Sequence, residues 1–188
     1  GIYEERANKD EASAIIGWLN KLDRSTLPSI GVVTLNLYQA DLIKEMIADK
    51  RTSEAEFDGL MIRLEERGFF VKNLENVQGD EREIMLLSTT FGLRQDGKFI
   101  QNYGPLNGRQ GYRLLNVLVT RAIHKFVVFT SVPDRYVDTY ADEINTFGKD
   151  GKGIFYAYLA YARAVSKGDD TSRQAVLDAL KSEDSDDA

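Results

Sequence analysis

Short apolar runs alternate along this chain with longer stretches of helical periodicity. The clearest runs are Ile30–Thr34, Glu83–Thr89 and Phe126–Thr130, and the second contains the continuous hydrophobic sequence IMLLS. An unbroken apolar run of this length is typical of a strand that is buried on both faces, as in a parallel sheet. Such strands alternating with helices predict an α/β chain with a three-layer fold, in which helices flank a largely parallel central sheet.

The helical stretches carry end signals. Asn36 can cap the helix that follows it, Gly68 can end the next one, and Thr171 can cap the last. Phe91–Gly111 is rich in glycine and is predicted to be a long loop or irregular hairpin. Phe69–Val71 is predicted to open a further strand. The predicted helices are Asn8–Leu22, Leu37–Asp49, Glu54–Arg67, Arg113–Ala122, Gly153–Val165 and Thr171–Leu180.

The size and charge of the chain limit its organisation and its partners. With 188 residues it fits one domain, which we expect to span residues 1–181, followed by an acidic disordered tail at 182–188. The formal net charge is −6. Affinity for nucleic acid comes largely from lysine and arginine neutralising phosphates, so any nucleic-acid contact of this chain has to be local.

The composition predicts a soluble protein of a reducing compartment. The chain has no cysteine, which excludes disulfides and thiolate metal sites. No apolar run approaches about 18 residues and no signal-peptide pattern opens the chain, so we expect a cytoplasmic protein without membrane contact. The first residue is Gly1 rather than Met, which suggests a fragment of a longer protein.

The stretch Arg113–Ala122 allows two interpretations. As a helix it gathers apolar residues on one side and Arg113, Asn116, Thr120 and Arg121 on the other. It is either a surface helix with an ordinary polar face, or a helix that points Arg121 into a cleft where it meets phosphate. Arginine suits the second task because its planar fork stays charged and pairs bidentately with phosphate oxygens.

Two other polar segments follow or precede predicted strands. Gln78-Gly79-Asp80-Glu81 is either a glycine-centred turn with solvated acids or a place where the backbone approaches a ligand closely. The segment from Thr34 to Gln39 is either a strand end with a helix cap or part of a binding site.

Several other kinds of site are excluded or disfavoured. His124 is the only histidine, so no Ser–His, Cys–His or histidine-metal catalytic set can be built, and the remaining acidic residues lack a metal-site spacing. The aromatic stripe Phe155–Tyr161 has helical spacing and is predicted to be core rather than a base-stacking platform. The chain contains no G-x-x-x-x-G-K-S/T phosphate loop.

Three motifs, taken in order, resemble those of the second RecA-like domain of superfamily 1 helicases. Asn116–Ala122, followed by the strand from Lys125, resembles motif VI, N-V-x-x-T-R-A-R/K. Val71–Ser88 resembles motif V, which contains V-x-T and Q-G-x-E, and Thr34–Gln39 resembles motif IV, T-P-Y/F-x-x-Q. A run near Tyr158–Ala162 is similar to one found in the Upf1-like (1B) branch, among large bacterial helicase-related proteins.

The sequence departs from these patterns at several positions. Ile123 replaces a second basic residue, Asn73 replaces a threonine, and Leu35-Asn36 replaces a Pro-aromatic pair. The phosphate loop, the Asp-Glu box and a Tyr-Arg-Met-His segment of the family are absent from this sequence. A rival hypothesis is therefore a non-catalytic, degenerate RecA-like module that binds protein or nucleic acid.

The resemblance implies a role for each matching residue. Arg121 would be the catalytic, γ-phosphate-sensing arginine, and Thr34 and Asn73 would contact nucleic acid. Residues implied to line the nucleotide cleft are Gln39, Gln78, Gly79, Glu81 and Arg113. The implied ligands are ATP and Mg²⁺, bound mainly by a first RecA-like domain that this sequence lacks, and single-stranded nucleic acid, with DNA favoured over RNA. The parent would be an ATP-dependent helicase, and this chain alone would not hydrolyse ATP.

Overall fold

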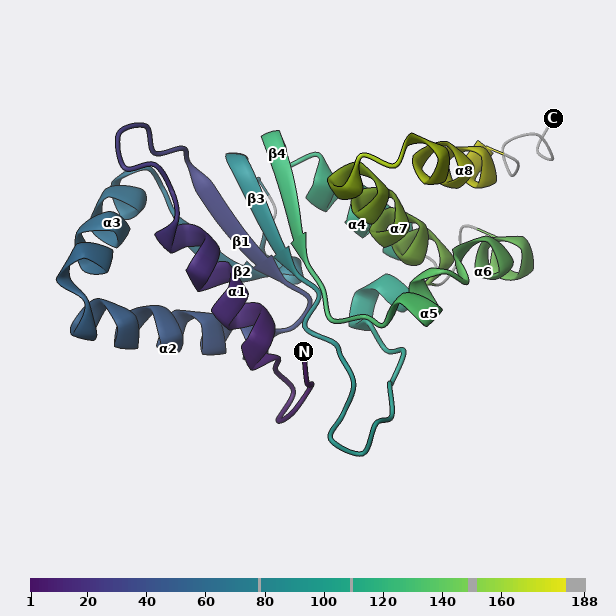
Figure 1. Cartoon of the computed structure of the whole chain (residues 1–188), viewed down its shortest axis with the longest axis horizontal. Coiled ribbons are helices and arrows are strands. Elements are labelled where there is room, and N and C mark those ends of the chain that lie inside the picture. Colours follow the sequence, from purple (N-terminus) through teal and green to yellow (C-terminus); the bar gives the residue numbers. More distant parts are fainter. Residues whose placement is uncertain (78, 109, 149–151, 182–188) are drawn as a thin grey trace. The chain divides into compact units, whose positions relative to one another are not determined.

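The computed structural model describes residues 1–77, 79–108, 110–148 and 152–181. The chain forms two compact units, one made of Gly1–Gln101 and Val117–Ser131 and the other of Asn102–Asn116 and the residues from Val132 onward. Figure 1 shows the helices and strands of each unit, coloured along the sequence. The single domain expected over residues 1–181 stays a prediction, and the expected disordered tail at 182–188 lies outside the described residues.

The first unit contains a parallel sheet. In the described residues its strands are β1 (Ile30–Thr34), β2 (Phe70–Asn73), β3 (Arg82–Ser88) and β4 (Ala122–Phe129), in the spatial order β2-β1-β3-β4. All three pairings are parallel. The register sets Thr34 beside both Asn73 and Ser88, at the carboxyl ends of the strands. The predicted α/β fold with a parallel sheet flanked by helices is confirmed.

The helices of this unit are α1 (Lys9–Asn20), α2 (Leu37–Ser53) and α3 (Ala55–Glu66), with a short 3₁₀ turn, η1, at Leu74–Asn76. Asn36 caps α2 as predicted, since its side chain accepts from the backbone N–H of Gln39 at 2.8 Å. Asn8 caps α1 in the same way, through the N–H of Glu11 at 3.1 Å. Gly68 follows α3 with φ of 79°, a left-handed conformation that suits glycine.

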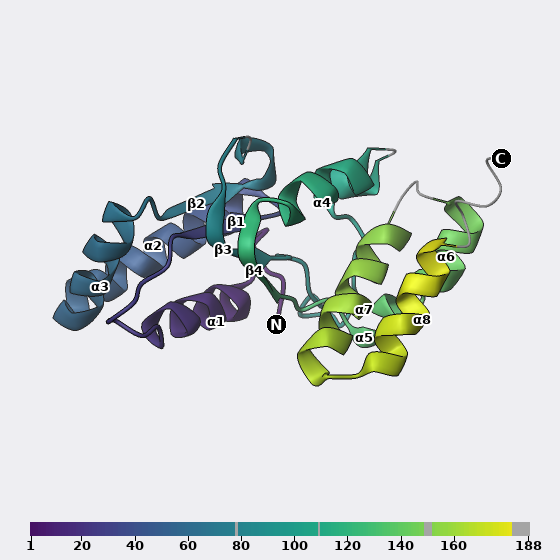
Figure 2. The ribbon, with the colours of Figure 1, turned by 90° about the horizontal axis from the view of Figure 1, so that it is seen from above.

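The core of the first unit lies between the sheet and its helices. α1 packs against β3 and β4 and lies beside α2, which packs against β1 and β2 (Figure 2). Every residue of β1 is buried, and the consecutive β3 residues Met85 and Leu86, which point to opposite faces, are both fully buried, so both faces of the sheet are covered. The continuous apolar runs of the sequence arise from this double burial.

The second unit is helical in its described residues. It contains η2 (Gly104–Asn107), α5 (Asp134–Val137), α6 (Tyr140–Phe147), α7 (Gly153–Lys167) and α8 (Asp170–Lys181). The rings of Tyr103 and Phe155 lie 4.8 Å apart, and the hydroxyls of Tyr103 and Tyr156 are 2.9 Å apart. Phe155, Tyr156 and Leu159 are buried, which confirms that the aromatic stripe of α7 belongs to a core.

Two boundaries at motif VI were predicted wrongly. α4 (Gly111–Val119) ends three residues before the predicted helix end at Ala122, and β4 begins at Ala122 rather than at Phe126. The N–H of Arg121 turns back to the carbonyl of Leu118 at 3.2 Å, while the carbonyl of Arg121 accepts from the N–H of Arg82 at 3.1 Å. The residues from Ala122 onward therefore pair in the sheet, and Arg121 lies in a turn instead of on a helix face.

Two features of the second unit also differ from expectation. Helix α6 was not predicted from the sequence, because its polar residues obscure the periodicity of its few buried ones. Thr171 lies inside α8; the capping side chain is that of Asp169, which accepts from the N–H of Ser172 at 3.0 Å. No helix among the described residues is long and apolar enough to span a membrane.

Candidate functional site

Segments 79–82 and 120–122 meet where β3 and β4 begin. Arg82 pairs with Ala122 in the ladder, and its N–H donates to the carbonyl of Arg121 at 3.1 Å. A register shift between Arg82 and Ile84 places an extra β4 residue opposite this point. Such irregularities redirect side chains and occur often beside functional sites. We call this end of the sheet the amino edge.

The structure brings Arg121 and Glu81 together at the amino edge. Nη1 of Arg121 lies 3.4 Å from Oε1 of Glu81, and the two side chains are 24% and 59% exposed. Nε of Arg121 is buried and has no hydrogen-bond partner among the described residues. The pair is a weak one, since exposed ion pairs contribute about 0–1 kcal/mol. Among the described residues, Nη1 of Arg121 thus makes one long contact and its Nε makes none.

Gly79 and Asp80 form the turn that leads to Glu81. Gly79 has φ of 87°, and a Cβ added there would meet no atom within 4 Å. The carboxylate of Asp80 binds Nζ of Lys72 at 2.6 Å, so this acid is paired rather than simply solvated. The backbone at Gly79 is open to an approaching ligand. Gln78, predicted to line the nucleotide cleft, lies outside the described residues.

Arg82 was not identified from the sequence. Its Nε donates to the carbonyl of Gly68 at 2.7 Å and its Nη1 donates to the carbonyl of Glu81 at 2.7 Å. Its guanidinium also lies 4.9 Å from the ring centroid of Phe70. Because both acceptors are main-chain carbonyls, which every residue carries, no residue-type pattern in the sequence signals this contact.

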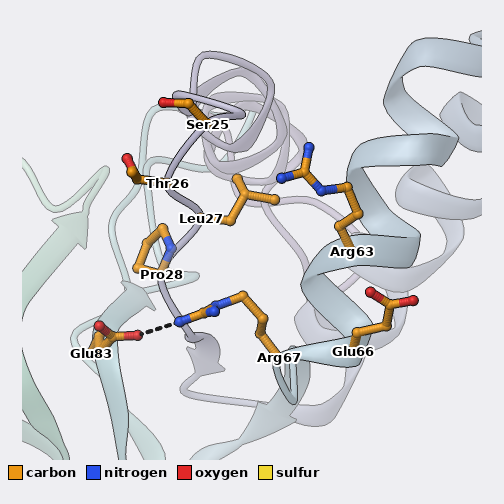
Figure 3. Close-up of a pocket in the computed structure, with 8 residues that line it drawn as sticks. All are labelled: Ser25, Thr26, Leu27, Pro28, Arg63, Glu66, Arg67 and Glu83. Atoms are coloured by element: carbon orange, nitrogen blue, oxygen red, sulfur yellow. Dashed lines mark hydrogen bonds and ion pairs between the residues drawn. The ribbon is translucent and has the colours of Figure 1, made fainter.

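A surface cavity of about 520 Å³ lies at the same edge, beside the starts of β1 and β3 (Figure 3). Arg67 Nη2 contacts Glu83 Oε2 at 3.3 Å across one side of it. The backbone and hydroxyl of Ser29 hydrogen-bond Glu83, and these bonds lower the pKa of its carboxyl, with a smaller contribution from Arg67. The lining residues are Ser25, Thr26, Leu27, Pro28, Arg63, Glu66, Arg67 and Glu83.

Thr34 and Asn73, the two predicted nucleic-acid contacts, lie side by side at the carboxyl ends of β1 and β2. The side chain of Thr34 is fully buried and its hydroxyl donates to the carbonyl of Asn36 at 2.6 Å. Oδ1 of Asn73 is buried and has no hydrogen-bond partner in the part of the chain that the structure describes. The sequence resemblance thus selected neighbouring residues, but in this structure the Thr34 hydroxyl serves the start of α2.

Gln39 also lies at the carboxyl ends of the strands and not beside Arg121 and Glu81. Its side chain is fully buried and binds the main chain of Asn8 at 2.7 and 3.0 Å and the hydroxyl of Ser88 at 3.1 Å. Ser88 and Arg82 stand at opposite ends of β3, about 20 Å apart at about 3.3 Å per residue. The structure gives Gln39 a role in joining α1, α2 and β3.

A buried carboxylate occupies the same end of the sheet. Glu11 is 3% exposed and accepts from the hydroxyls of Ser88 (2.6 Å) and Thr89 (3.1 Å) and from the N–H of Thr90 (2.8 Å). Burial raises the pKa of Glu11, and the hydrogen bonds from these groups oppose that rise. Glu11 was not identified from the sequence, although its position three residues after a cap asparagine is a recognisable signal.

Arg113, the weaker arginine candidate, lies on α4 and belongs to the second unit. Its side chain is exposed, and its Nε donates to the hydroxyl of Tyr112 at 2.9 Å. Because the two units are described separately, a role for Arg113 at the site of Arg121 stays a prediction.

Comparisons with known proteins identify the family of the chain. Residues 3–132 match the protein family described as AAA domain. The chain is 32% identical over 189 residues to the uncharacterized ATP-dependent helicase MG140 of Mycoplasma genitalium, a match covering 94% of this chain and 16% of that protein. It is 33% identical over 171 residues to the MG140 homolog of Mycoplasma pneumoniae, covering 88% of this chain and 14% of that protein. The chain thus spans about a sixth of the length of these relatives.

The family match covers well over half of the chain and includes Glu81 and Arg121, the residues that directly precede β3 and β4. The chain therefore belongs to this AAA-domain family, a helicase-like family of the Upf1 type.

Proposed function

We propose that this chain is the second motor domain of an ATP-dependent, superfamily 1 nucleic-acid translocase and supplies its arginine finger. The observation that carries the proposal is the Arg121 guanidinium beside Glu81 at the amino edge, with a buried Nε that has no protein acceptor. A buried donor without an acceptor costs free energy, so a movement of the Arg121 side chain that brings its fork to a phosphate oxygen is favoured. The similarity to proteins named as ATP-dependent helicases supports the same assignment.

In this mechanism the nucleotide and Mg²⁺ are held mainly by a first RecA-like domain, which carries a phosphate loop. Arg121 meets the γ-phosphate and stabilises charge that develops on the transferred group. Glu81 faces the nucleotide from the same edge, and Gly79 lets the backbone approach it. Closure of the two domains requires contacts that differ between the nucleotide states. Arg121 supplies such a contact, because its pair with Glu81 is weak enough to break at small cost.

The full-length protein tests the arginine finger. We expect Arg121→Ala to bind ATP and to hydrolyse it about a thousandfold or more slowly, as other arginine fingers behave. Arg63→Ala is the matched control, since Arg63 lies at the same edge and its Nη2 donates to the carbonyl of Arg24 at 2.6 Å. Near-normal hydrolysis by Arg121→Ala would refute the proposal. The 188-residue chain alone should show no ATPase activity.

The second candidate is a non-catalytic RecA-like module. The buried Thr34 hydroxyl favours it, because a contact expected to reach nucleic acid is directed inward. Replacing the upstream part of the full-length protein by that of an active relative distinguishes the two. A motor domain restores hydrolysis that depends on Arg121, whereas a degenerate module does not.

A further inference from the structure

Arg82 connects three segments that converge on the amino edge. Its Nε binds the carbonyl of Gly68, in the turn between α3 and β2, and its Nη1 binds the carbonyl of Glu81, both at 2.7 Å. Its guanidinium packs on the ring of Phe70 in β2. Gly68 leaves room for this arrangement, because a Cβ at that position would lie 3.0 Å from Nη2 of Arg82.

The main chain of Arg82 joins the same network to Arg121. Its N–H donates to the carbonyl of Arg121 at 3.1 Å. One residue therefore holds the backbone of Glu81 through its side chain and the backbone of Arg121 through its main chain. The register shift of the β3–β4 ladder lies directly after this point, between Arg82 and Ile84. Regular ladder hydrogen bonds alone therefore do not fix the positions of Glu81 and Arg121.

The contacts of Arg82 argue against a direct role as a phosphate ligand. Two of its nitrogens donate to main-chain carbonyls, and its guanidinium stacks on an aromatic ring. Side chains with donors fixed in this way typically hold other site residues in place and do not contact the ligand themselves. Arg121 differs, since its Nε has no protein acceptor.

We infer that Arg82 is a positioning residue for nucleotide hydrolysis, which acts by holding the main chain that carries Glu81 and Arg121. The inference rests on the proposed function of Arg121. A misplacement of about 1 Å can slow a reaction about a hundredfold, so loss of the Arg82 bridge should lower kcat even though Arg82 touches no reactant.

A double-mutant cycle in the full-length protein tests this. We expect Arg82→Ala to lower kcat for ATP hydrolysis about tenfold to a hundredfold with little change in KM. Arg82→Ala combined with Arg121→Ala should lose much less than the product of the two single losses, because part of the effect of Arg82 acts through Arg121. Arg82→Lys should remain slow, since lysine lacks the planar fork that donates from two nitrogens and stacks on Phe70. Added guanidinium ion should restore part of the activity of Arg82→Ala.

Arg67→Ala is the control, because Arg67 lies at the same edge and, among the described residues, forms its ion pair with the side chain of Glu83; it should keep near-normal kcat. A normal kcat in both Arg82→Lys and folded Arg82→Ala would overturn the inference. A double variant whose loss of kcat equals the product of the two single losses would overturn it as well. A normal Arg121→Ala would instead remove the proposed function itself. If Arg82→Ala does not fold, thermal melting identifies it and Arg82→Lys decides the question.

Discussion

At the scale of single residues, the carboxylate of Glu11 links folding to pH. Burial raises its pKa, so between the unfolded pKa near 4.3 and the folded value the native state binds more protons than the unfolded state. The contribution of Glu11 to the free energy of unfolding therefore falls as pH rises through this window. Denaturant unfolding of the wild type and of Glu11→Gln from pH 4 to 8 measures this contribution. The free energy of unfolding of the wild type, relative to that of the variant, should fall as the pH rises. Glu45→Gln, at an exposed carboxylate of α2, is the control; an unchanged Glu11→Gln difference across the range would contradict the prediction.

Gly79 and Gly59 form a matched pair for testing backbone strain. A Cβ at either position would meet no atom within 4 Å, but Gly79 has φ of 87° and Gly59 lies inside α3. We expect Gly79→Ala to lower the free energy of unfolding by about 1–2 kcal/mol, since a side chain disfavours the left-handed region. Gly59→Ala should raise it by about 0.5–1 kcal/mol, because alanine favours a helix. Equal effects in denaturant titrations would show that φ is not the cause.

At the scale of elements, the cap of α2 fixes the end of β1 where Thr34 lies. Asn36 accepts from the N–H of Gln39 and donates from Nδ2 to the carbonyl of Arg6 at 2.8 Å. We expect Asn36→Ala to cost about 1 kcal/mol of stability, the usual value of a cap, and more if the Arg6 contact contributes. Glu54→Ala is the comparison, because Glu54 occupies the cap position of α3 without a side-chain cap bond. A thermal shift no larger than that of Glu54→Ala would contradict the prediction.

The sequence predicted elements well where burial decided them and poorly where a tertiary contact did. β1 was predicted residue for residue, because both of its faces are buried. The end of α4 was misplaced, because a hydrogen bond from Arg82, far away in sequence, draws Arg121 into the ladder. Glu11 has the spacing of a capping box with Asn8, but its carboxylate instead reaches Ser88, and Gln39 accepts from the N–H of Asn8. Local patterns do not contain these competing partners.

The candidate site divides in the same way. The resemblance selected Arg121 and Glu81, which the fold brings within 3.4 Å of each other, and Thr34 and Asn73, which are ladder neighbours. It also placed Gln39 with the nucleotide residues, whereas the fold puts it at the other end of β3. Arg82 could not be found this way, since its partners are carbonyls. Sequence spacing predicts which residues lie at the same end of the sheet. The direction in which each side chain points depends on packing.

At the scale of the whole molecule, the net charge of −6 limits what the chain can bind by itself. Phosphate contacts supply most of the affinity for single strands and weaken with salt, and a net negative charge opposes association. We expect the 188-residue chain to show no measurable binding to a fluorescent single-stranded DNA oligonucleotide at about 150 mM salt, with weak binding emerging only well below that. Fluorescence anisotropy across a salt series measures this.

The acidic end of the chain provides the control for that experiment. Residues 182–188 contain four acidic residues, so a chain ending at Lys181 has a formal net charge of −2. If the tail alone repelled nucleic acid, its removal would produce strong binding at about 150 mM salt. We expect only a modest gain, because the rest of the chain is not basic and the Thr34 hydroxyl is buried. Micromolar or tighter binding by the shortened chain would contradict the view that a second domain must complete the nucleic-acid track.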